Sequence, residues 1–109
     1  MAARLSLTIC RQFQTAADLL GKRWTALVVQ QLKEGPRRYS DLAGKLDVVS
    51  ERVLIQRLKE LEGAGVVERR VYGEQPVRVE YRLTDKGRAL SRVIGSLERW
   101  ANEWIVATT

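Results

Sequence analysis

The chain has 109 residues, 45% of them hydrophobic, and its 19 Lys and Arg against 13 Asp and Glu give a formal net charge of +6, which favours a polyanionic partner such as nucleic acid. This length predicts one domain over residues 1–109, and because the longest apolar run, residues 26–29, is far too short to span a bilayer, we expect a cytoplasmic protein without membrane contact. One cysteine and no histidine exclude an intramolecular disulfide and remove the commonest metal ligand and general base, so we expect no metal, no cofactor and no enzymatic activity.

Two helices are predicted in the first third of the chain. Apolar residues recur three and four positions apart over residues 9–20, as one face of a helix requires, and Gly21 ends this segment. A second helix is predicted from Lys22 to about Glu34, where Gly35 and Pro36 stop it.

A short helix followed by a longer one is predicted over residues 40–64. Ser40 is expected to cap a helix of about two turns. After a turn, Ser50 is expected to cap a longer helix in which Leu54, Leu58 and Leu61 repeat at spacings of four and three. Short helix, turn and longer helix form the helix-turn-helix arrangement.

The hydrophobic period changes to two over residues 66–83. Two alternating segments flank the turn formers of residues 73–76, which predicts an antiparallel hairpin with a charged tip. Such a hairpin after a helix-turn-helix is a wing, so the predicted class is α+β, mainly α. Glu74 at the tip would repel phosphate.

The last helix, over residues 84–106 with Thr84 as its cap, carries a wide apolar surface. A surface this wide is costly to leave in water, so we expect it to pack against a second copy of the chain in a two-fold homodimer. The alternative is that the helix folds back onto its own core. The interface residues expected on this helix are Leu90, Ile94, Leu97, Trp100, Ala101 and Trp104.

The exposed face of the longer helix is the candidate site for base recognition. If its leucines face the core, a period of 3.6 places Arg52, Gln56 and Lys59 on the opposite side, with Ile55 at the edge. Arg can pair with guanine and Gln with adenine in the major groove, while Lys more often contacts phosphate. A solvated helix face is the alternative. Arg57 lies nearer the core edge and is expected to pair with an acid.

Other residues are expected to position the duplex. Arg37 and Arg38 precede the short helix, and Arg78 lies beside the wing turn, where a guanidinium can reach phosphate or the minor groove. Surface solubility for Arg37 and an ion pair for Arg38 are the alternatives. Ser50 can contact phosphate at the helix N-terminus or serve only as a cap.

Cys10 is a candidate sensor of oxidants or electrophiles. We expect it at a helix start beside Arg11, where positive potential favours the reactive thiolate. The alternative is a small, inert packing residue.

The chain resembles the HxlR family of winged helix-turn-helix regulators, relatives of the MarR type, over nearly its whole length. The resemblance lies in Cys10 and in segments 20–24, 35–42, 54–62, 77–81 and 83–87. Two positions depart from the usual pattern: Arg11 stands where the family often has proline, and Ile55 where it often has threonine.

The resemblance implies a homodimer joined through the first and last helices, which adds Phe13 to the expected interface. It also implies a two-fold DNA operator and an affinity that changes with a chemical signal, a small molecule or an oxidant. We therefore expect a sequence-specific regulator of transcription acting as a repressor. The alternative is a winged helix that contacts another protein instead of DNA, and salt dependence of binding separates the two.

Overall fold

The computed structural model describes residues 2–73 and 75–106, with side chains from Cys10 onward. The expectation for Glu74 therefore lies outside the described residues. The elements in chain order are α1 (Ala2–Gly21), α2 (Thr25–Gln31), β1 (Arg37–Arg38), α3 (Tyr39–Lys45), α4 (Glu51–Gly63), β2 (Val67–Tyr72), β3 (Arg78–Leu83) and α5 (Asp85–Trp104).

The observed bounds of the first two helices differ from those that the apolar pattern predicts. α1 begins well before residue 9, and α2 is much shorter than residues 22–34. Trp24, predicted inside the second helix, adopts left-handed backbone with φ of 77°, so α2 can only begin after it. The helix ends before Gly35, whose φ of 150° suits a residue without a side chain.

The helix-turn-helix is confirmed, but the residue at the N-cap of its first helix, α3, differs from the prediction. Ser50 precedes α4 and its Oγ accepts a hydrogen bond from the Val53 amide at 3.2 Å. Ser40, by contrast, lies inside α3. That helix begins after Arg38, whose amide donates to Asp41 Oδ2 at 3.3 Å. Arg38 thus occupies the N-cap position that we predicted for Ser40, and Asp41 in the first turn accepts the amide of that residue.

The predicted hairpin is present, and a third strand extends it. β2 and β3 pair antiparallel, with Val67 opposite Leu83 and Tyr72 opposite Arg78. The two-residue β1 pairs with the other edge of β3, giving the sheet order β1-β3-β2. A strand this short has no period of its own, so the sequence did not predict it. Its effect is to attach the start of α3 to the wing.

The start of α5 is fixed against the end of α4. Thr84 caps the helix as predicted, because its Oγ1 accepts from the Gly87 amide at 3.1 Å. The Thr84 amide in turn donates to the Val66 carbonyl at 3.1 Å. Gly87 lies so close to Val66 that a Cβ atom there would come within 2.1 Å of the same carbonyl oxygen.

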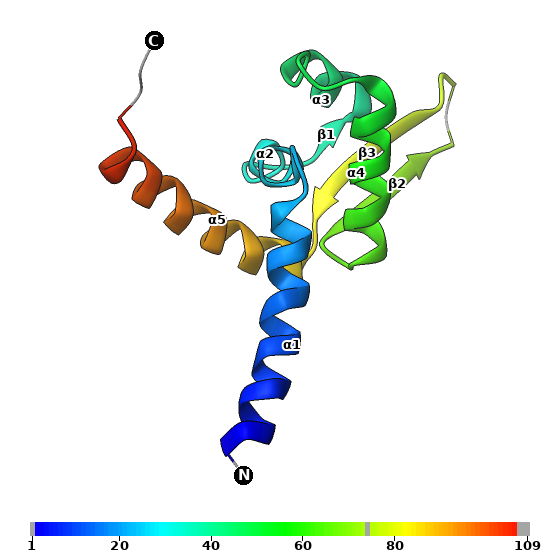
Figure 1. The fold of residues 1–109 in the computed structure, drawn as a ribbon. Helices are drawn as coiled ribbons and strands as arrows, with labels where there is room; N and C mark the ends of the chain where they lie inside the picture. The colour runs from blue at the N-terminus through cyan, green and yellow to red at the C-terminus, as the bar shows by residue number, and fades with distance from the viewer. Residues whose placement is uncertain (1, 74, 107–109) are drawn as a thin grey trace.

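The core lies between α2, α3, α4, the sheet and the middle of α5. Its buried apolar residues are Val28, Val29, Leu32, Leu42, Leu46, Val49, Leu54, Leu58, Leu61, Val66, Val67, Leu83 and Ile94. α1 and α5 leave this body in different directions (Figure 1). The radius of gyration is 16.2 Å, against about 13 Å for a compact chain of this length, as expected for a body with two projecting helices.

Candidate nucleic-acid interface

α4 divides into a buried and an exposed face, as the leucine spacing predicts. Leu54, Leu58 and Leu61 are at most 1% exposed. On the opposite side Arg52, Gln56 and Lys59 are exposed and, with Glu51 and Ile55, line an open hollow of about 560 Å³. The helix therefore presents hydrogen-bonding side chains that its own core does not use. We call Arg52, Ile55, Gln56 and Lys59 the α4 strip.

Ion pairs anchor α4 to the turn between α1 and α2. Arg57 Nε donates to the Arg23 carbonyl at 2.9 Å, and its Nη1 lies 3.0 Å from Glu60. Lys22 Nζ contacts the other oxygen of Glu60 at 2.7 Å. The hydrogen bond from Lys22 is the largest cause that holds the pKa of Glu60 below its usual value, and Arg57 adds to it. Arg57, for which an acidic partner was expected, thus fixes the position of the helix.

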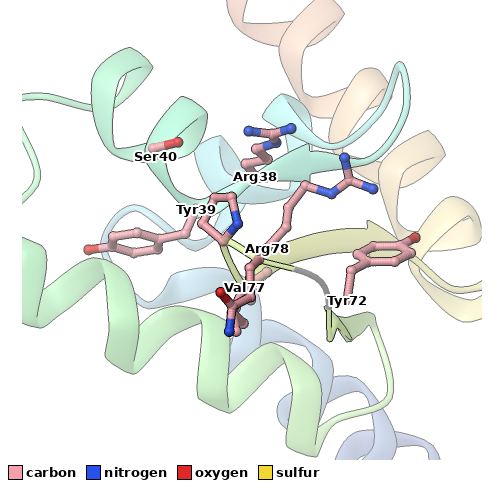
Figure 2. Close-up of a pocket in the computed structure, with 9 residues that line it drawn as sticks. Arg38, Tyr39, Ser40, Tyr72, Val77 and Arg78 are labelled. Atoms are coloured by element: carbon pink, nitrogen blue, oxygen red, sulfur yellow. The ribbon is translucent and has the colours of Figure 1, made fainter.

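The wing and the start of α3 enclose a second hollow, of about 410 Å³. Arg78 extends across it with its guanidinium 4.6 Å from the centre of the Tyr72 ring, and its Nε lies 3.4 Å from Glu80. Arg38 and Ser40 line the same hollow from β1 and α3, and Figure 2 places Arg38 beside the outer end of Arg78. The fold thus brings together two cations that the sequence places 40 positions apart.

Arg37 is only partly available. Its Nε donates to the Gln31 carbonyl at 2.6 Å, which closes the end of α2. For Arg37 the sequence offered a DNA contact or surface solubility. It did not predict this helix-closing role, which depends on a backbone group six residues away. Arg38 has no ion-pair partner among the described residues.

Tyr39 lies between α4 and the sheet. Burial, and next the negative charge of Glu51, raise the pKa of its phenol above the usual value. Tyr39 therefore stays neutral at physiological pH. It lines a third hollow, of about 470 Å³, together with Ile55, Lys59, Glu62, Arg69, Val79 and Tyr81.

The residues expected at a dimer interface fall into two groups. Phe13, Leu97, Trp100 and Trp104 are between 52% and 70% exposed, and Ala101 is half-buried. Ile94, in contrast, is only 2% exposed and Leu90 packs against the same core. The inner part of α5 thus folds back onto its own chain, and Ile94 is not available to a partner. The alternative that the helix folds back onto its own core is thus confirmed for the inner part of α5, and packing of the outer part against a second copy stays a prediction.

Cys10 is exposed, but it is not at a helix start. α1 begins at Ala2, so two turns of helix precede the thiol and the N-terminal amide groups are distant. The predicted position of Cys10 at a helix start is therefore wrong, because the helix begins seven residues before the apolar pattern at residue 9.

The part of the chain that the structure describes comprises residues 2–73 and 75–106. No cluster of three or more potential metal ligands occurs there. No helix there is both long and apolar enough to cross a membrane.

Comparison with known proteins places this arrangement in a family. The profile of the HxlR-like helix-turn-helix family matches residues 19–109. The uncharacterized HTH-type transcriptional regulator YvaP of Bacillus subtilis is 53% identical over 97 residues, 89% of this chain and 90% of the relative. The HTH-type transcriptional regulator YodB of the same organism is 41% identical over 89% of this chain and 87% of its own length.

Solved structures agree with the sequence relatives. Reduced YodB matches with a TM-score of 0.80 and 39% identity over 90% of this chain and 96% of that chain. Diamide-treated and quinone-bound YodB match with a TM-score of 0.75 each, at 40% and 38% identity, over 88% and 85% of this chain and 95% and 97% of those chains. The redox regulator HypR in its oxidized form matches with a TM-score of 0.81 and 27% identity, over 88% of this chain and 99% of that chain. The chain belongs to the HxlR-like helix-turn-helix family and is a winged helix-turn-helix transcriptional regulator.

Proposed function

We propose that the protein binds double-stranded DNA sequence-specifically as a homodimer, with α4 of each chain in the major groove. The observation that carries the proposal is the division of α4 into a fully buried leucine face and an exposed strip with Arg52, Gln56 and Lys59. An α-helix fits the major groove, where arginine can form a bidentate pair with guanine and glutamine with adenine.

Phosphate contacts on both sides of α4 would fix its register. Arg38 and Arg78 lie in the hollow between the wing and α3, and stacking on Tyr72 holds the Arg78 guanidinium. Ser50, an exposed residue, adds the N-terminus of α4. Arg37 contributes less, since one of its donors is already bonded to α2.

Dimerisation would occur through the projecting helices. Leu97, Trp100 and Trp104 on the outer part of α5, and Phe13 on α1, are large apolar side chains left more than half exposed by the single chain. Patches of this kind on a small domain mark protein contacts, and a two-fold dimer buries the same patch on both copies. Two copies would present two α4 helices to successive turns of one DNA face.

A chemical signal would act on this dimer, and we propose Cys10 as the residue that receives it. Cys10 is exposed on α1, one helical turn before Phe13, so a bulky adduct on it would disturb the proposed interface. A quinone would add at Sγ to form a C–S bond, and the thiol proton would end on a ring oxygen. We propose that the unmodified dimer represses its promoter and that the adduct releases it.

The experiment that tests DNA recognition is selection of bound duplexes from a random pool. Arg52→Ala and Gln56→Ala should lose the selected consensus and keep nonspecific affinity, because phosphate contacts remain. Lys33→Ala, which removes an exposed charge outside this surface, is the matched control and should keep it. An unchanged consensus in the first two variants would refute the assignment.

Salt dependence separates DNA binding from a protein-binding function. The logarithm of the affinity should fall by about 0.9 per phosphate contact for each tenfold rise in salt. A flat response would favour the protein-binding alternative. For the signal, quinone treatment should weaken operator binding of the wild type and leave Cys10→Ser unaffected; equal responses would exclude Cys10.

A further inference from the structure

We propose that Ile55 recognises thymine, by packing its side chain against the C5 methyl group of that base in the major groove. The proposal rests on the proposed function, because it requires α4 to lie in that groove. It adds a base-discriminating residue to Arg52 and Gln56, and it differs from them in using an apolar contact.

Ile55 lies between Arg52 and Lys59 along the helix, at the edge of the α4 strip that borders the sheet. It follows Arg52 by three residues, precedes Lys59 by four and is adjacent to Gln56, so all four side chains share one side of the helix. Of the five residues lining the hollow on this side, Ile55 is the one apolar residue. A helix placed to let Arg52 and Gln56 reach base edges therefore brings Ile55 beside neighbouring bases in the same groove.

Core packing does not account for this residue. The leucines of α4 are buried to 1% exposure or less, whereas Ile55 is 39% exposed. Its inner side borders the third hollow, between α4 and the sheet, which side chains of this chain leave unfilled. An exposed apolar group between charged ones is unfavourably hydrated, and contact with an apolar group of a ligand would remove that surface from water.

The side chain is also held in place. An isoleucine in a helix has one strongly preferred χ1 rotamer because two heavy atoms branch from Cβ. α4 itself is anchored through Arg57 and Glu60 to the turn before α2. The methyl groups of Ile55 are therefore presented at a fixed position, as a contact that discriminates between bases requires.

The chemistry of the major groove indicates which base Ile55 would contact. The thymine C5 methyl is the apolar group among the base edges of the major groove, and the other positions offer hydrogen-bond donors and acceptors. Contact with sugar or phosphate instead would carry no dependence on the base.

The test removes single methyl groups from the DNA. In the duplex selected by the wild type, each thymine is replaced in turn by deoxyuridine, which keeps base pairing, and the Kd is measured by fluorescence anisotropy at fixed salt. We expect one thymine in each half-site where the replacement weakens wild-type binding about three- to tenfold, as burial of one methyl group predicts. Ile55→Ala should bind both duplexes equally at that position, and Ile55→Val should keep a reduced preference.

Val48→Ala is the matched control, because it shortens a 72% exposed aliphatic side chain outside the α4 strip. It should keep the full sensitivity to deoxyuridine. The proposal is overturned if no thymine is sensitive, or if Ile55→Ala and Ile55→Val keep the wild-type sensitivity. In either case a consensus that still depends on Arg52 would leave the proposed function standing, whereas selection of no consensus by the wild type would refute both.

Discussion

Gly87 tests the packing that orients α5 relative to α4. In an exposed helix, replacing glycine by alanine stabilises a protein by about 1 kcal/mol. At Gly87 the structure predicts the opposite sign, because the new Cβ would lie 2.1 Å from the Val66 carbonyl oxygen and 3.1 Å from Leu83 Cδ2. The carbonyl cannot withdraw freely, since it accepts a hydrogen bond from the Thr84 amide at 3.1 Å.

The expected change in the free energy of unfolding of Gly87→Ala follows from these contacts. Overpacking costs about 1 to 3 kcal/mol, and loss of the hydrogen bond from the Thr84 amide costs about 1 kcal/mol more. After the gain in helix propensity, the free energy of unfolding should fall by about 2 kcal/mol. For a chain of this size that lowers the Tm by about 8 to 16 °C.

The assay is thermal unfolding of Gly87→Ala and Gly95→Ala followed by circular dichroism at one protein concentration. Gly95 lies in the same helix, and the nearest atom to its added Cβ is Arg99 Nη1 at 3.6 Å, an ordinary contact. Gly95→Ala should therefore raise the Tm by a few degrees. A Tm for Gly87→Ala equal to or above that of the wild type would refute the reasoning.

Three further predictions concern the cap, the ion pairs and the dimer. Ser50→Ala should lower the free energy of unfolding by about 1 kcal/mol in urea titrations, since the Val53 amide loses its acceptor; an unchanged midpoint would contradict the cap. Glu60→Gln should destabilise by about 1 kcal/mol at pH 7, because Lys22 loses its partner. The pKa of Glu60 is lowered by folding, so its contribution is present above the usual value of 4.5 and is lost as pH falls below it. A difference between wild type and Glu60→Gln that stays constant down to pH 3 would contradict this. Trp100→Glu should reduce the mass in light scattering from two chains to one, because it places a charge in the proposed interface; an unchanged dimer would place the interface elsewhere.

The elements predicted correctly are those whose signals are local. Ser50 and Thr84 each stand directly before a helix and have a side-chain oxygen within reach of an amide three residues on. The leucine spacing of α4 fixes which face is buried. Because both signals require only neighbouring residues, the helix-turn-helix and the exposed α4 strip could be predicted from the sequence.

The features that were missed depend on distant contacts. β1 exists because β3 offers it an edge, and its two residues carry no pattern. The left-handed Trp24 is a non-glycine residue that local preference disfavours, so its position is fixed by the fold around it. Ile94 lies on the same helical stripe as Leu97 and Trp104, and only the fold determines where the buried part of that stripe ends.

Methylation interference at guanine N7, an atom of the major groove, tests most directly whether two α4 helices occupy neighbouring major-groove turns of one duplex. Wild-type protein should be sensitive to methylated guanines in two half-sites about 10 base pairs apart, and Arg52→Ala should lose that sensitivity. Binding that is indifferent to N7 methylation, or sensitivity confined to one site on a duplex that holds a single chain, would contradict the account.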